Sequence, residues 1–147
     1  TLAMNRAYGG NSAIPVRFVF ELAAPTYFVA EDWGSLMKSD NLGSEEEFYR
    51  MMTGKELSAQ EYRQEIKKIS PTCLVGEDSV PTLIGYGLKD HCVPADQKEY
   101  LIDALEKNGV SYDYVEFPHS NHLLYGDLDK MQTFMDLSLE YCKKYFQ

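Results

Sequence analysis

Residues 80–94 read VPTLIGYGLKDHCVP, and these residues indicate the fold most clearly. Its first part, residues 81–86, is a short run without charge, which is typical of a parallel strand covered on both faces. Gly87 then begins a turn that contains Asp90, and Pro94 indicates the start of a helix. A buried strand, an acidic turn and a helix in this order predict one unit of an α/β fold.

A second strand end with a titratable side chain follows along the chain. Residues 110–117 alternate in polarity, as an edge strand does, and His122 lies in the loop after them. Because active residues of parallel sheets gather at the carboxyl ends of the strands, we expect Asp90 and His122 to lie side by side. A carboxylate on imidazole Nδ1 fixes the tautomer and leaves the other ring nitrogen free to take a proton from a hydroxyl.

The remaining segments complete an alternating pattern. Residues 2–8 read as the end of a helix closed by two glycines, residues 16–22 as a β-branched and aromatic strand, and residues 127–147 as a helix. The order helix, strand, insertion, strand, helix, strand, helix predicts parallel strands joined by right-handed crossovers.

The segment 26–70 differs in character from the rest and is predicted to be a helical insertion. Two capping boxes, at residues 44–47 and 58–61, each precede apolar residues at helical spacing. About 45 residues bury too little surface to form a domain, so we expect the insertion to lie over the sheet, either as a cap or as simple packing.

Composition excludes several classes of partner. The net charge is −9 and no basic cluster is present, so nucleic acid and anionic membrane surfaces are poor partners. No apolar run approaches the roughly 20 residues that span a bilayer. Cys73, Cys92 and Cys142 are odd in number and widely spaced, which argues against a disulfide framework or a structural zinc site and favours the reducing cytoplasm.

Residues 80–94 resemble the acid strand and turn of the α/β-hydrolase superfamily, where the pattern is approximately P-T-L-hydrophobic-x-x-G-x-x-D-x-x-V-P. Residues 105–110 and 115–118, with a histidine shortly after, also match, and the order acid then histidine is that of the family. The resemblance covers the chain nearly end to end and is closest to the esterase and lipase-like carboxylester hydrolases. It implies a three-layer, partial α/β-hydrolase fold with about three parallel strands, and a small-molecule ester as substrate. No metal or organic cofactor is implied.

The resemblance also implies which side chains are catalytic. Asp90 would be the acid and His122 the base, because the family histidine ends its loop and directly precedes the last helical segment. By this criterion His122 is preferred to His119. His91 fills a variable position of the pattern and is expected to be a loop residue.

The family nucleophile is absent from the sequence. The superfamily serine lies in a G-x-S-x-G turn, and no such pentapeptide occurs in these 147 residues. Ser12 follows a helix and lacks the second glycine, and Ser120 belongs to the wrong strand end. Residues 1–8 resemble the remainder of the helix that follows the nucleophile. We therefore expect residues 1–147 to be the C-terminal part of a hydrolase domain, inactive by itself.

Several alternatives stay open at this point. The parent protein could be a prolyl-oligopeptidase-like peptidase, or the chain could be a non-catalytic α/β interaction module. Five side chains of the insertion either line an acyl or alcohol pocket or pack the insertion onto the sheet, and the sequence favours packing; they are Tyr27, Phe28, Trp33, Met51 and Met52. The hydrophobic strand 16–22 would lie at an open edge, and homodimerisation is predicted through this edge or through the helix 1–8.

Overall fold

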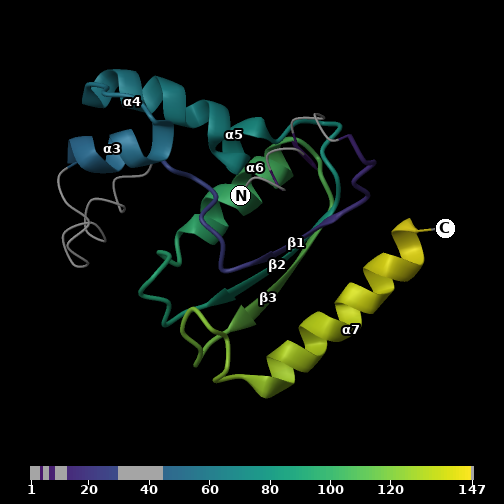
Figure 1. The fold of residues 1–147 in the computed structure, drawn as a ribbon. Coiled ribbons are helices and arrows are strands. Elements are labelled where there is room, and N and C mark those ends of the chain that lie inside the picture. The colour runs from purple at the N-terminus through teal and green to yellow at the C-terminus, as the bar shows by residue number, and fades with distance from the viewer. Residues whose placement is uncertain (1–3, 5–6, 9–12, 30–44, 147) are drawn as a thin grey trace.

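The computed structural model describes residues 4, 7–8, 13–29 and 45–146. These residues form a parallel sheet of three strands in the order β1-β2-β3. Its strands are β1 (Val19–Leu22), β2 (Thr82–Gly87) and β3 (Tyr112–Phe117). Helices lie on both faces of the sheet (Figure 1), so the expected three-layer α/β arrangement is confirmed.

The central strand β2 is buried along its whole length. It pairs with β1 on one side and with β3 on the other, and helices cover both of its faces, which explains why its sequence is a run without charge. The first strand is shorter than the predicted 16–22, because its pairing begins where Val19 lies opposite Thr82, the first residue of β2.

One face of the sheet packs against α6 (Gln97–Lys107) and the helices of the insertion. Ile84 and Tyr86 of β2 contribute to this core together with Leu101 and Leu105 of α6. The N-terminal residues that the structure describes also belong to it, since Met4, Ala7 and Tyr8 are helical and buried. The predicted helix start at Pro94 is displaced by three residues, because Ala95 and Asp96 form a turn.

Among the helices that the structure describes, α7 (Leu128–Tyr145) packs against the opposite face (Figure 1). Leu83, Val115 and Phe117 of the sheet contact this helix through a core that includes Phe134 and Tyr141. The Tyr141 hydroxyl lies 2.9 Å from an oxygen of Asp113 and 3.2 Å from the carbonyl oxygen of Thr82. None of the helices in the described ranges is long and apolar enough to cross a bilayer.

The insertion contains the two helices that the sequence predicts, α3 (Glu45–Thr53) and α4 (Ala59–Ile66), followed by η1 (Lys67–Ile69) and α5 (Pro71–Leu74). The capping box of Ser58 and Glu61 is formed, whereas Ser44 lies outside the described residues.

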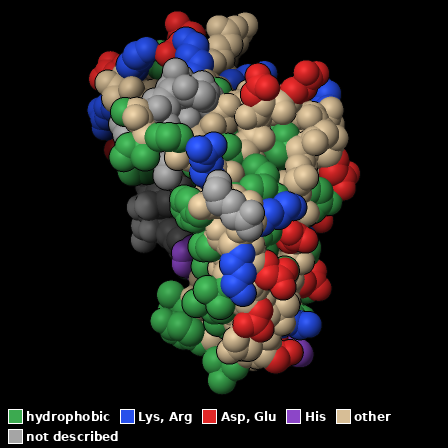
Figure 2. Space-filling view, turned by 90° about the vertical axis from the view of Figure 1, so that its right-hand side faces the viewer, with side chains coloured by type: hydrophobic (Ala, Val, Ile, Leu, Met, Phe, Trp, Pro, Cys, Tyr) green, Lys and Arg blue, Asp and Glu red, His purple; other side chains and the backbone are tan. Residues whose placement is uncertain are grey.

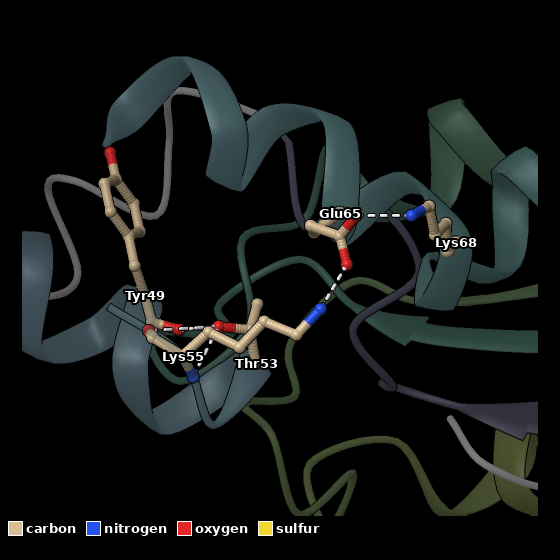
Figure 3. Close-up of polar contacts among 5 residues, drawn as sticks. All are labelled: Tyr49, Thr53, Lys55, Glu65 and Lys68. Atoms are coloured by element: carbon tan, nitrogen blue, oxygen red, sulfur yellow. Dashed lines mark hydrogen bonds and ion pairs between the residues drawn. The ribbon is translucent and has the colours of Figure 1, made fainter. Parts of the chain in front are cut away.

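A small ionic cluster ties the link between α3 and α4 to the end of α4 (Figure 3). Lys55 Nζ lies 2.8 Å from Glu65 Oε2, and Lys68 pairs with the other oxygen of Glu65. Hydrogen bonds from Lys55 and Lys68 lower the pKa of Glu65 to about 2. The cluster is on the surface, so we expect it to hold the local helix arrangement more than the global fold.

Strand β1 forms one edge of the sheet, as the sequence analysis expected for its strand 16–22. Phe20 and Leu22 are 40% and 43% exposed, while Val19 and Glu21 point into the core. Figure 2 shows groups of apolar side chains among charged ones on one face of the molecule. Homodimerisation through this strand stays a prediction.

Candidate active site

Asp90 and His122 are delivered by neighbouring strand ends. Asp90 follows β2 and His122 follows β3, and these strands pair from Thr82 opposite Tyr112 to Gly87 opposite Phe117. Since the two parallel strands end at the same level, the loops that leave them meet at one edge of the sheet.

The two side chains form a hydrogen-bonded pair. His122 Nδ1 lies 2.8 Å from Asp90 Oδ2. The Asp90 side chain has no exposure and the His122 side chain is 39% exposed. Asp90 Oδ1 accepts hydrogen bonds from the backbone N–H groups of Cys92 and Val93, at 2.7 and 2.9 Å. The carboxylate is therefore fixed on both oxygens, and the outer nitrogen of the imidazole is left for other chemistry.

Gly87 allows the two loops to approach each other. The N–H of Lys89 donates to the carbonyl oxygen of Ser120 at 3.0 Å, and the N–H of Leu88 donates to that of Phe117 at 3.1 Å. A Cβ atom at residue 87 would lie 2.5 Å from the Ser120 oxygen and 2.6 Å from the Asn121 oxygen. Because both obstacles are backbone atoms, any side chain here would push the His122 loop away from Asp90.

His119 has a different partner, Asp127. His119 Nδ1 lies 2.8 Å from Asp127 Oδ1, and the histidine side chain is 72% exposed. Asp127 Oδ2 accepts from the backbone N–H of His119 at 3.0 Å and from the Ser120 hydroxyl at 2.6 Å. Burial alone would raise the pKa of Asp127, but the hydrogen bonds from Ser120 and His119 outweigh it and hold the pKa below its ordinary value.

Ser120 does not lie where a nucleophile would be expected. Ser120 is only 1% exposed, and its hydroxyl oxygen also accepts from the N–H of Gly126 at 3.0 Å. These hydrogen bonds tie Ser120 to Asp127 and Gly126 and so stabilise the loop between β3 and α7. Ser12 lies outside the described residues, and His91 is an exposed loop residue.

Three residues near the carboxyl ends of the strands were not predicted from the sequence to belong to a site. One is Asp127. The second is Cys92, whose exposed thiol lies within 4.8 Å of ligand atoms of Asp90 and His122. The third is Glu21 at the end of β1. Burial raises the pKa of its carboxyl group to about 8, although the hydrogen bond from the Ala24 N–H lowers this pKa. The alternation of a strand could have identified Glu21, because every second residue of β1 lies on the same face and Glu21 shares the inward face with Val19.

The insertion side chains that were considered for a pocket differ in burial. Phe28 and Met52 pack into the core, Tyr27 lies against Tyr100, and Met51 is 65% exposed. Of the two alternatives, packing and not pocket lining therefore applies to Phe28 and Met52. Trp33 falls outside the part of the chain that the structure describes.

The family model described as the prolyl oligopeptidase family matches residues 8–147. No curated protein sequence matched the chain.

Solved structures with similar folds are hydrolases. One is an acetyl ester-xyloside bifunctional hydrolase from Caldicellulosiruptor lactoaceticus, at 17% identity and a TM-score of 0.59, covering 88% of this chain and 43% of that chain. Another is the esterase Est2 from Thermogutta terrifontis with butyrate bound, at 20% identity and a TM-score of 0.56, covering 86% of this chain and 42% of that one. The chain thus spans less than half the length of these structures, and the likeness shows an α/β-hydrolase fold, as expected.

Proposed function

The chain belongs to the prolyl oligopeptidase family, and we propose that it carries the acid–base pair of a serine hydrolase that acts on carboxylic esters. In this proposal Asp90 orients His122 and stabilises the imidazolium that forms on proton uptake. His122 removes the proton of the attacking serine and then gives it to the leaving alcohol. The observation that carries the proposal is the 2.8 Å hydrogen bond between His122 Nδ1 and the buried Asp90.

The serine nucleophile is proposed to come from polypeptide outside this sequence. No G-x-S-x-G turn occurs within the 147 residues, and the chain spans 43% of the first hydrolase structure compared. Without a nucleophile and oxyanion donors the chain would keep only the proton-transfer half of the reaction, so we expect it to be inactive by itself.

Esters are proposed as the substrate class because the similar structures carry such activities in their names. One is described as an acetyl ester hydrolase and another as an esterase with butyrate bound. The family description favours a second candidate, peptide hydrolysis. The same acid–base pair suits both, because His122 can protonate an alcohol or an amine leaving group.

A substrate panel separates the two candidates. The protein to assay extends this chain upstream through a G-x-S-x-G turn, with p-nitrophenyl acetate, p-nitrophenyl butyrate and a prolyl-peptide anilide as substrates. Turnover of the nitrophenyl esters with little anilide cleavage supports the ester assignment, and the reverse preference supports the peptidase. Turnover of neither, with no labelling by a fluorophosphonate probe, would favour a non-catalytic interaction module.

The 147-residue chain provides the matched control. We expect no ester turnover above background and no fluorophosphonate labelling. Stoichiometric labelling of Ser12 or Ser120 would show that the nucleophile is within the chain and would contradict the proposal. The cytoplasmic location stays a prediction from the cysteine pattern.

A further inference from the structure

Cys92 extends the Asp90–His122 pair into a cluster of three different metal-ligating groups. One carboxylate oxygen, one imidazole nitrogen and the Cys92 sulfur all lie within 4.8 Å of one another. We propose that Cys92, His122 and Asp90 form a binding site for a thiophilic divalent cation, represented by zinc.

The backbone fixes the relative positions of these groups. The N–H of Cys92 donates to Asp90 Oδ1 at 2.7 Å, so the cysteine is anchored to the same carboxylate that holds His122. Asp90 is buried, whereas the Cys92 side chain is exposed and His122 is partly exposed. A cation can therefore approach from solvent and meet ligands that already lie close together.

The distances approach those of a zinc site but require an adjustment of the groups. His122 Nδ1 and Asp90 Oδ2, which are 2.8 Å apart, would have to separate, and the Cys92 sulfur, within 4.8 Å, would have to come closer. With bonds of about 2.3 Å to sulfur and about 2.0 Å to nitrogen or oxygen, the ligand atoms of a tetrahedral zinc lie about 3.5 Å apart. The exposed Cys92 side chain can close the remaining gap by rotation about its χ1 bond. Three protein ligands leave a fourth position for water, as in open zinc sites.

The chemistry of the ligand set selects the class of cation. A thiolate favours zinc and other thiophilic metals over magnesium or calcium, which prefer oxygen ligands. A cation at this position would engage both His122 and Asp90 and disrupt the hydrogen bond between them. The inhibition of hydrolysis that would follow rests on the proposed function, whereas the binding itself does not.

The test is a zinc titration of the 147-residue chain in competition with a chromophoric chelator. We expect one zinc per chain, with affinity reduced about 100-fold or more in Cys92→Ser, since the loss of a ligand should exceed the 10–100-fold cost of losing an outer partner. Cys73→Ser is the matched control, because Cys73 is also an exposed free cysteine. It should bind zinc as the wild type does.

Cobalt reports directly on the sulfur ligand. The cobalt-loaded wild type and Cys73→Ser should show thiolate-to-metal charge-transfer absorption, and Cys92→Ser should lack it. Absence of zinc binding, unchanged binding in Cys92→Ser, or equal losses in both cysteine variants would each overturn the proposal. Because the titration needs no turnover, a chain that binds zinc while its extended form hydrolyses no substrate would overturn the proposed function alone.

Discussion

The two histidines after β3 each form a hydrogen bond of the same length with an aspartate, but the two aspartates come from different parts of the chain. His122 and His119 each hold an aspartate oxygen at 2.8 Å from Nδ1. Asp127 is eight positions from His119 on the same loop, whereas Asp90 is 32 positions from His122 and comes from another strand end. One pair closes a loop, and the other joins two loops at the carboxyl edge of the sheet.

The other partners of each aspartate indicate its role. Asp127 also accepts from the His119 backbone and the Ser120 hydroxyl, so it stabilises the loop that carries both histidines. Asp90 Oδ1 accepts from the N–H groups of its own turn, and Asp90 Oδ2 is hydrogen-bonded to His122 and orients its ring. Bond length therefore does not distinguish the two pairs, whereas the origin and the remaining contacts of each carboxylate do, and on these the proposed catalytic role of Asp90 and His122 rests.

The largest contrast is expected between the two histidine variants. In the protein extended through its nucleophile, His122→Gln should lower kcat for p-nitrophenyl butyrate by about 10⁴-fold or more, because no base remains to activate the serine. His119→Gln should stay within about tenfold of the wild type, since its ring faces solvent. Similar losses of kcat in the two variants would contradict the different roles given to His122 and His119.

The aspartate variants should differ in kind. Asp90→Asn should lower kcat by about 10⁴-fold, because an amide stabilises the wrong imidazole tautomer. Asp127→Asn should instead lower the melting temperature, because a neutral amide oxygen accepts more weakly than a carboxylate from the His119 N–H and the Ser120 hydroxyl. Thermal unfolding by circular dichroism and steady-state kinetics measure the two effects; a catalytic loss of equal size in Asp127→Asn would contradict the assignment.

Gly87→Ala tests the approach of the two loops. The new methyl would meet the backbone oxygens of Ser120 and Asn121, so we expect a destabilisation of about 1–3 kcal/mol and a displaced His122. Gly76→Ala is the control, because no atom lies within 4 Å of the added Cβ, and it should stay within about 0.5 kcal/mol of the wild type. Urea unfolding of the 147-residue chain measures both; equal stabilities would contradict the close approach.

The smallest expected effect is a pH dependence that belongs to Asp127. Because its pKa is lower in the folded chain than in the unfolded one, Asp127 contributes stability above the ordinary aspartate pKa of about 3.9 and loses it as the pH falls. The free energy of unfolding should therefore fall less steeply in Asp127→Asn than in the wild type below about pH 4. Parallel urea-unfolding curves for the two proteins across this range would contradict the lowered pKa.

Much of the fold and the central pair could be predicted from sequence, because the relevant signals are local. The run at 81–86 identifies a buried strand, and Asp90 and His122 follow strand ends that a parallel sheet must bring to one edge. The capping residues Ser58 and Glu61 likewise predict the start of α4. The catalytic role of the pair stays a prediction.

The remaining features depend on contacts that no local pattern encodes. An aspartate just before a helix is usually read as its cap, yet the Asp127 side chain makes no capping bond and instead holds His119 and Ser120. The start of β1 was misplaced because pairing with β2 decides it. The position of Cys92 beside His122 follows from the turn geometry of Asp90, which the sequence leaves undetermined.

The central claim is that Asp90 holds His122 in the Nδ1–H tautomer and so leaves Nε2 free to accept a proton. A ¹H–¹⁵N correlation spectrum of the histidine side chains of the 147-residue chain, at a pH where the imidazole is neutral, tests it directly, with His122→Gln to identify the His122 signals. The account predicts that His122 is an Nδ1–H tautomer and that Asp90→Asn abolishes this preference. An Nε2–H tautomer at His122, or a spectrum unchanged in Asp90→Asn, would contradict it.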